Sequence, residues 1–244
     1  MLVTSTLVSI IIQLLTGGID IWGLTIPVQN NFNIYRDLLK IELGVQTVEL
    51  IFYIWLITKL HALKNITIYR YMDWFITTPT MLFTLIVYLY HRGQELSLTD
   101  FIRTNKRNIF IITGLNALML VFGLLGELGI LSVNVSVTLG FIPFAYYFWF
   151  IYKEYIMSLP EDDSMPMQTV NGIKPGVNAS KILSKTTKTY VFLYFVVFWA
   201  LYGICAYLPY VHKNTGYTIL DLFAKNGFGI LLVYFIWQLR TQKN

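Results

Sequence analysis

Seven apolar stretches, each long enough to cross a lipid bilayer, limit the folds open to this chain more than any other feature. A transmembrane helix needs about 20 mainly apolar residues in sequence. Only 13% of the residues are charged, about half the share found in a soluble domain. We therefore predict an all-α integral membrane protein, with a single domain over residues 1–244 that forms a seven-helix bundle. The predicted spans are 2–22, 36–58, 66–90, 107–126, 132–154, 188–209 and 216–239.

The segments between the spans differ in length and composition. Residues 23–35 contain Pro27 and three asparagines, so we expect an interfacial turn there. Residues 155–187 form the longest link and are rich in Asp, Gly, Pro and Asn, which predicts a flexible polar loop. No basic region precedes the first apolar stretch, so we interpret residues 2–22 as a span and not as a cleaved signal peptide.

Lysines and arginines gather in alternate links, and this sets the predicted orientation. Basic residues are concentrated in the cytoplasmic loops of membrane proteins. Thirteen of the 18 lie in or beside the first, third and fifth links and the C-terminal tail, whereas three lie on the opposite side. The N-terminus is therefore predicted to lie outside and the C-terminus in the cytoplasm. The glycosylation sequon at Asn178 would then face the cytoplasm and stay unmodified.

Six ionisable residues lie inside the predicted spans, away from their ends. Charged side chains at membrane depth are costly and normally face the bundle interior, where they pair or carry a function. Asp221 and Lys225 are four residues apart, so they share one face of the last span. Either a structural ion pair between helices or a functional centre would account for them. The six residues are Glu42, Glu49, Arg70, Asp73, Asp221 and Lys225.

The third span carries the sequence RYMDWFITTP, from Arg70 to Pro79. Arg70, Asp73 and Thr77 share one helical face, and Pro79 is expected to kink the helix. The pattern R-Y-x-D-W-x-x-T-T-P, together with D-x-x-x-K in the last span, resembles the microbial rhodopsins. The resemblance covers all seven spans and their polarity. It implies a bound all-trans-retinal and no enzymatic activity.

The resemblance implies a role for each charged residue of this pattern. Lys225 would bind retinal as a Schiff base, because a lysine amine condenses with an aldehyde. Asp73 and Asp221 match the two counterions of the cation that results, and Arg70 matches the gating arginine of the family.

The resemblance also implies the surroundings of the chromophore. Tyr53 and Tyr202 match the tyrosines that hydrogen-bond the aspartate of the last span. In the sixth span, Gly203 stands where proline is usual, which leaves the usual kink open, because glycine can also supply flexibility there. Gly140 and Phe144 are the candidates on the fifth span. The other implied pocket residues, with Tyr202, are Trp74, Thr78, Met81, Asn116, Met119 and Trp199.

An outward proton pump of this family needs groups that the chain supplies only in part. Asp73 would accept the proton. Thr84 stands where the internal donor carboxylate would be, and threonine does not titrate near neutral pH. The link before Asp221 contains no carboxylate for proton release. Pumping is therefore poorly supported by the sequence.

The second and last spans favour a cation channel instead. Glu42 and Glu49 are seven residues apart and face the same seam, and a ring of carboxylates favours cations. The run G-x-T-I-x-D-L-x-x-K-N-x-x-G resembles the seventh span of channelrhodopsins. The short link between the second and third spans and the minimal termini resemble compact rhodopsins from viruses of algae. In channelrhodopsins, a serine on the first span, a glutamate on the second and the asparagine after the lysine form the central gate. These would be Ser9, Glu49 and Asn226.

We therefore expect a light-gated cation channel in the plasma membrane or a host-cell membrane. Isomerisation of retinal and deprotonation of the Schiff base would open a hydrated path past Arg70, Tyr53 and Thr77. A light-driven outward proton pump, a sensory photoreceptor and a retinal-free bundle remain as alternatives. The expected partners are retinal, lipid, cations or protons and further copies of the chain, with no nucleic acid and no metal.

Overall fold

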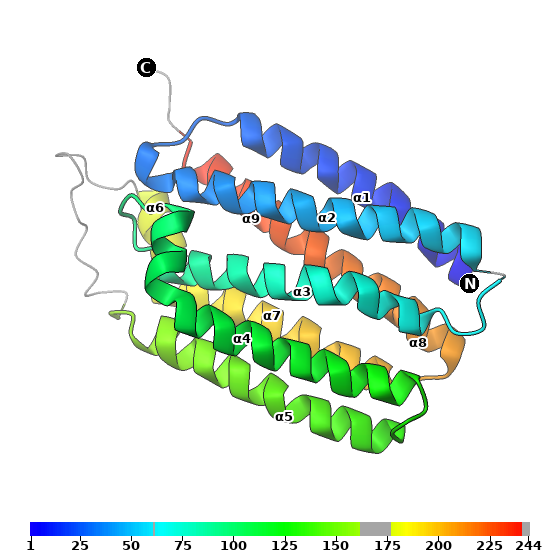
Figure 1. Ribbon diagram of the computed structural model, residues 1–244. Helices are drawn as coiled ribbons and strands as arrows, with labels where there is room; N and C mark the ends of the chain where they lie inside the picture. The colour runs from blue at the N-terminus through cyan, green and yellow to red at the C-terminus, as the bar shows by residue number, and fades with distance from the viewer. Residues whose placement is uncertain (61, 162–176, 241–244) are drawn as a thin grey trace.

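The computed structural model describes residues 1–60, 62–161 and 177–240, which form a bundle of seven long helical segments (Figure 1). All seven are long and apolar enough to cross a membrane, as predicted. The first six are α1 (Leu2–Thr25), α2 (Asn33–Lys59), α3 (Thr67–Tyr90), α4 (Leu98–Glu127), α5 (Val133–Ile151, continued by the π-helical segment Tyr152–Met157) and α7 (Lys185–Cys205). The seventh comprises α8 (Tyr210–Asp221), the π-helical segment Leu222–Asn226 and α9 (Gly227–Gln238).

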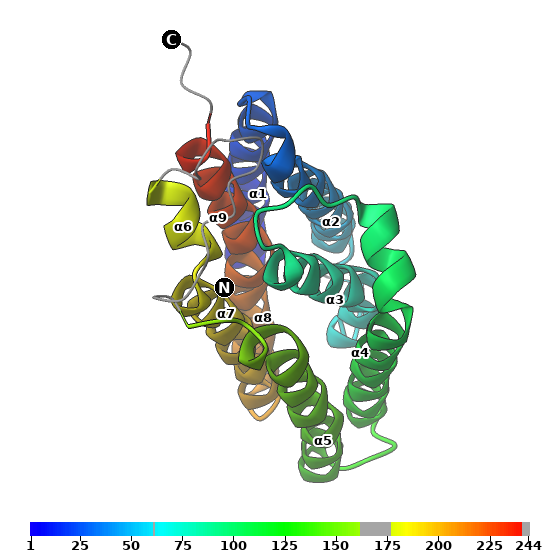
Figure 2. The ribbon, with the colours of Figure 1, turned by 90° about the vertical axis from the view of Figure 1, so that its left-hand side faces the viewer.

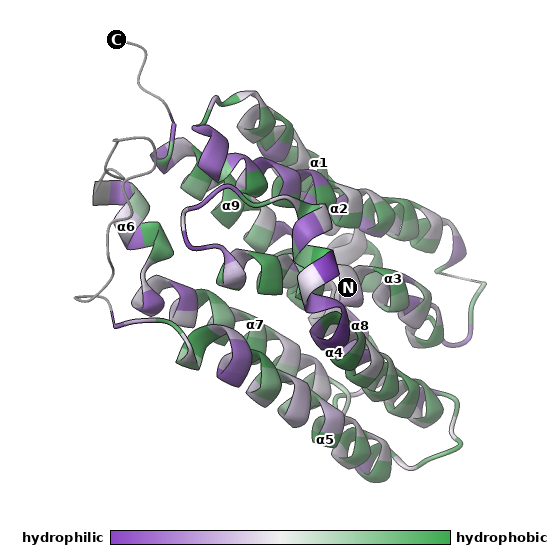
Figure 3. Cartoon of the chain, turned by 60° about the vertical axis from the view of Figure 1, so that its left-hand side comes forward, coloured by the Kyte–Doolittle hydropathy of each residue, from purple (hydrophilic) through white to green (hydrophobic). Residues whose placement is uncertain are grey.

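The helices follow one another around the bundle in chain order (Figure 2). The segment made of α8 and α9 lies between α7 and α1 and also contacts α2. The N-terminus and the short helix α6 (Val177–Leu183) lie at opposite ends of the bundle (Figure 1). Hydrophilic residues gather at the links and helix ends, whereas the middle of α4 and α5 is mainly apolar (Figure 3).

The fourth helix begins nine residues before the predicted start at position 107, at Leu98. The side chain of Ser97 accepts a hydrogen bond from the backbone N–H of Asp100 (3.1 Å) and thereby caps the helix. The polar first turns of α4 extend beyond its apolar stretch, so hydropathy placed the start too late. Asn105 has a non-helical backbone (φ −109°, ψ 17°) within this extension.

The boundary between the sixth and seventh spans also differs from the prediction. α7 ends at Cys205 rather than at position 209, and Pro209 is the N-cap of α8. The last span therefore starts six residues earlier than predicted, at Tyr210. The turn expected in the first link is present as a single 3₁₀ turn, Asn30–Phe32.

The end of the longest link is helical, which corrects the prediction of a flexible loop there. α6 buries Ala179, Ile182 and Leu183, each 4–5% exposed, against the core. Tyr88 donates a hydrogen bond from its hydroxyl to the carbonyl of Ile182 (3.3 Å). The polar composition of the link masked this short apolar pattern. The rest of the predicted loop includes positions 162–176, which lie outside the described residues.

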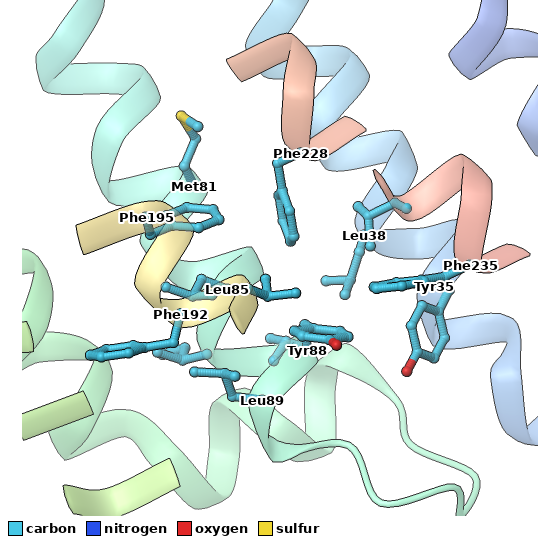
Figure 4. Close-up of a cluster of buried hydrophobic side chains, with 14 of the residues drawn as sticks. Tyr35, Leu38, Met81, Leu85, Tyr88, Leu89, Phe192, Phe195, Phe228 and Phe235 are labelled. Carbon is cyan, nitrogen blue, oxygen red and sulfur yellow. The ribbon is translucent and has the colours of Figure 1, made fainter. Parts of the chain in front are cut away.

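Aromatic and aliphatic side chains fill the half of the bundle nearest α6 (Figure 4). Tyr88 of α3 stacks on Phe235 of α9, with ring centroids 5.6 Å apart. Tyr35 of α2 meets both rings edge-on. Phe195 of α7 and Phe228 of α9 pack at 4.9 Å. Close packing of this kind leaves little room for water, so this region closes the bundle between α2, α3, α7 and α9.

His91 follows α3 and is buried beneath the first link. Its Nε2 lies 2.9 Å from the carbonyl oxygen of Asn31 and 3.0 Å from that of Gln94, so this nitrogen is the donor. Lys188 donates from Nζ to the carbonyls of His91 (2.5 Å) and Leu89 (3.0 Å), which places a cation beside the imidazole. Burial, followed by the charge of Lys188, lowers the pKa of His91 from 6.5 to about 4.

We expect acidification to destabilise the protein through His91. The unfolded chain takes up this proton near pH 6.5, whereas the folded protein resists protonation until about pH 4. The stabilisation is therefore complete above pH 6.5 and is lost as the pH falls, with a total loss of about 3 kcal/mol. Thermal unfolding of His91→Gln should depend less on pH over this window than that of the parent. The exposed His212→Gln variant should keep the parent dependence, and equal slopes for both variants would contradict the assignment.

Candidate functional site

Lys225 lies inside the bundle, in the π-helical segment between α8 and α9. Its Nζ forms an ion pair with Asp73 of α3 and lies 3.7 Å from Oδ1 of Asp221. π-Helical turns are rare and occur frequently at functional sites. The structure thus brings together the amine and the two carboxylates that the sequence singled out.

Asp221 accepts hydrogen bonds from four side chains. Oδ2 accepts from the hydroxyl of Tyr53 (2.7 Å) and from Nη1 of Arg70 (3.2 Å). Oδ1 accepts from the hydroxyl of Tyr202 (2.7 Å) and from Nε1 of Trp74 (3.2 Å). Both tyrosines therefore lie where the resemblance placed them. Together the four donors fix the orientation of the carboxylate beside the amine.

Arg70 uses all of its N–H groups within the bundle. Besides Tyr53 and Asp221, it bonds Asn214 twice, from Nε to Oδ1 (3.1 Å) and from Nη2 to the carbonyl (3.1 Å). Nη2 also donates to the hydroxyl of Thr218 (2.8 Å). The planar guanidinium group presents its donors in a fixed fork, so Arg70 ties α3 to both α2 and α8.

Two cations and two carboxylates meet at this centre, and each of the four residues is at most 3% exposed. Removing one member of such a buried set leaves an uncompensated charge, which is strongly destabilising. A buried primary amine can condense with an aldehyde. Neighbouring carboxylates would then stabilise the positive charge that the product carries.

A cavity extends from Lys225 toward α4, α5 and α7. Six of the seven predicted pocket residues line it, as do Gly140 and Phe144 of α5. The exception is Asn116, which instead donates from Nδ2 to the hydroxyl of Thr78 (2.7 Å) and so positions a residue of the wall. The six lining residues are Trp74, Thr78, Met81, Met119, Trp199 and Tyr202.

Flat aromatic side chains form much of the cavity wall and suit a conjugated polyene. Trp199 stacks on Phe195, with centroids 4.9 Å apart and ring planes within 20°. Phe141 also lines the cavity and lies so close to Gly203 that a β-carbon at Gly203 would collide with its ring. At this position, where the family usually has proline, any larger residue would have to displace the ring of Phe141. No pattern in the sequence pointed to Phe141.

A second group of buried polar side chains lies between α1, α2 and the π-helical segment. Asn226 donates from Nδ2 to Oε2 of Glu49 (3.4 Å) and accepts from the hydroxyl of Thr16 (2.6 Å). Thr16 therefore supplies the hydroxyl that the resemblance assigned to Ser9. Ser9 lies about two helical turns away on the same face, where its hydroxyl accepts from Nε2 of Gln13 (2.9 Å).

The inward face of α1 is polar along its whole length, whereas its outward residues are mainly apolar. Sequence reasoning missed this, although polar residues spaced three or four apart within an apolar stretch are a visible signal. The buried residues of α1 are Thr6, Ser9, Gln13, Thr16, Asp20 and Gly23. We use the term polar seam for the following residues: Ser9, Gln13, Thr16, Asp20, Glu42, Gln46, Glu49 and Asn226.

The part of the polar seam nearest α6 contains two further carboxylates. Glu42 accepts a hydrogen bond from the hydroxyl of Thr84, and Asp20 accepts one from Nε2 of Gln46. The sequence places no carboxylate at position 84, but Glu42 of α2 brings a carboxyl group into contact with Thr84. Thr77 bonds within its own helix, to the carbonyl of Asp73 (2.9 Å).

Seven membrane-spanning helices around a buried lysine–aspartate centre define a helical membrane protein of the rhodopsin type. The chain belongs to the bacteriorhodopsin-like family, whose model, described as bacteriorhodopsin-like protein, matches residues 1–239. Members of this family bind retinal, and the chain is a multi-pass integral membrane protein. None of the curated proteins compared with the chain matches it.

Solved structures share this fold. The viral rhodopsin OLPVRII is 24% identical with a TM-score of 0.72, over 98% of this chain and 99% of its own. The thermophilic rhodopsin from Rubrobacter xylanophilus is 18% identical with a TM-score of 0.72, over 98% and 97%. Xanthorhodopsin, described as a light-driven ion pump with dual chromophore, is 18% identical with a TM-score of 0.68, over 96% and 91%. At these identities the likeness establishes a common architecture and not a common transport activity.

Proposed function

We propose that this protein is a light-gated cation channel whose chromophore, retinal, is attached to Nζ of Lys225. The observation that carries the channel assignment is the polar seam. It places carboxylates, amides and hydroxyls from α1, α2 and the last span inside the bundle, beside the aromatic and aliphatic cluster between α2, α3, α7 and α9. Acidic side chains along a pore favour cations over anions.

The cavity fits retinal by its chemistry. One end is the primary amine of Lys225, and the walls are aromatic and aliphatic side chains of α3, α4, α5 and α7. Retinal, when bound, supplies the absorption of visible light and a light-driven change of shape. Trp74 and Trp199 provide flat walls, and Asp73 and Asp221 hold positive charge at Nζ.

Gating follows from the contacts of Lys225 with its neighbours. Oδ2 of Asp73 touches Nζ, so it is the oxygen placed to take up a proton from that nitrogen. Loss of this charge removes the attraction between residue 225 and Asp221. The next residue in the chain is Asn226, whose side chain bonds both Glu49 and Thr16. A shift of this turn breaks those bonds and lets water into the polar seam.

A light-driven outward proton pump is the second candidate, because Glu42 contacts Thr84. This contact places a carboxyl group beside the position where a pump of this family carries its internal proton donor. Whole-cell recording under illumination separates the two functions. We expect photocurrents that reverse sign as the membrane voltage is changed. Currents that stay outward at every voltage would establish a pump, and no current at all would favour a sensory photoreceptor.

Glu49→Gln should alter the cation selectivity of the photocurrent. Glutamine keeps the size of the side chain and an acceptor for Asn226, but it removes the negative charge from the polar seam. We expect a shift in reversal potential when external sodium is replaced by another cation. The exposed Glu95→Gln variant, which also loses one carboxylate, should match the parent. A parent-like reversal potential in Glu49→Gln would show that Glu49 only packs.

A further inference from the structure

Asp20 and Gln46 are the residues of the polar seam that lie where α1, α2 and α9 come together. Both residues are at most 3% exposed, and Nε2 of Gln46 donates to Oδ2 of Asp20. Both side chains pack against Gly229 of α9. A β-carbon at Gly229 would lie 2.6 Å from both Oδ2 of Asp20 and Nε2 of Gln46. The side chains of Asp20 (α1) and Gln46 (α2) therefore pack directly against the backbone of α9, and they can do so because residue 229 has no side chain.

This contact lies in line with the contacts around Asn226. Thr16, which bonds Asn226, is one helical turn before Asp20 on the same face of α1. Gly229 follows Asn226 by three residues, and Gln46 precedes Glu49 by three. Because α1 runs away from the N-terminal end (Figure 1), Asp20 lies on the α6 side of Asn226. Along the polar seam, Asp20 therefore follows Asn226 in the direction of α6.

The polar atoms of this contact are only partly satisfied by the protein. Among the described residues, Oδ1 of Asp20 and Oε1 of Gln46 have no hydrogen-bond partner, and neither has Oε2 of the neighbouring Glu42. Buried polar atoms without partners are costly and rare. A purely structural contact between helices would be better served by apolar side chains. Oxygen atoms of this kind are the groups that replace the hydration shell of a cation.

We propose that Asp20 determines ion selectivity at a second constriction, which its bond to Gln46 closes against Gly229 in the dark. The proposal rests on the proposed channel function. When the polar seam hydrates, the carboxylate of Asp20 attracts cations on the α6 side of Glu49 and repels anions. Two acidic constrictions in series then act on each ion.

Asp20→Asn is the direct test, in the full chain loaded with retinal and expressed in cells. Asparagine keeps the size and an acceptor for Gln46 but removes the charge. We expect photocurrents severalfold smaller than the parent at matched visible absorbance. In a sodium chloride gradient, the reversal potential should move toward that of chloride. Asp20→Glu should restore a parent-like reversal potential, and Asp37→Asn, a change at a half-exposed position of α2, should have no effect.

Gly229→Ala tests the same constriction without changing any charge. Its methyl group would press on both Asp20 and Gln46, so we expect a severalfold smaller photocurrent with the absorbance retained. Gly18→Ala is the matched control on α1, because a β-carbon there meets no atom within 4 Å. Parent-like currents in both Asp20→Asn and Gly229→Ala would overturn this inference alone. A parent current that never reverses with voltage would overturn the channel function and this inference with it.

Discussion

Lys225→Ala is expected to remove all visible absorbance from protein purified with all-trans-retinal supplied. Alanine has no amine to condense with the aldehyde, and free retinal does not acquire the colour of an attached, positively charged chromophore. The absorbance spectrum after removal of unbound retinal is the measurement. Lys40→Ala, which removes an exposed lysine of α2, should leave the spectrum unchanged.

Loss of colour must be separated from loss of fold, because Lys225 also balances two buried carboxylates. Lys225→Arg provides this separation. Arginine keeps the positive charge beside Asp73 and Asp221 but offers no primary amine. Circular dichroism and gel filtration should report a folded, helical protein that remains colourless. A coloured Lys225→Ala or Lys225→Arg protein would end the assignment of the attachment site.

Arg70→Gln is expected to lower the free energy of unfolding by about 3–5 kcal/mol, the usual cost of breaking a buried charge pair. The variant removes the ion pair with Asp221, which leaves that buried carboxylate with fewer hydrogen-bond donors. It also removes the hydrogen bonds to Asn214 and Thr218. The measurement is a thermal denaturation curve, in which the loss of visible absorbance reports unfolding.

Two comparisons sharpen the test of Arg70. Arg70→Lys should rescue little of the lost stability, because an ammonium group cannot reproduce the planar set of five N–H donors. Arg103→Gln, at an exposed position of α4, should unfold at the parent temperature. A parent-like unfolding temperature for Arg70→Gln would mean that the network around Asp221 contributes little to folding.

The sequence was sufficient to predict the seven spans and the group around Lys225. Apolar length reports a span directly, and charges at membrane depth must find partners inside the bundle. The contacts of Tyr53 and Tyr202 with Asp221 agree with what the resemblance implied.

Other features depend on how the helices lie against one another, which cannot be inferred from the residue pattern of one helix at a time. Ser9 and Thr16 lie on the same face of α1, and only the sliding of α1 against the last span decides which hydroxyl reaches Asn226. Asp20 was not among the candidate residues, because its partner Gln46 belongs to another helix and the contact is visible only in the fold. The polar first turns of α4 and the short helix α6 were missed, since neither is apolar enough to register as a span.

The polar inward face of α1 has a consequence for movement within the bundle. Where two helices pack through apolar side chains, separating them exposes apolar surface to water, which costs free energy. α1 instead meets its neighbours largely through amides, hydroxyls and one carboxylate. Water can replace such contacts almost one for one. The first helix is therefore the part of the bundle that can separate from its neighbours at the lowest cost, and under the proposed channel function it is the helix we expect to move.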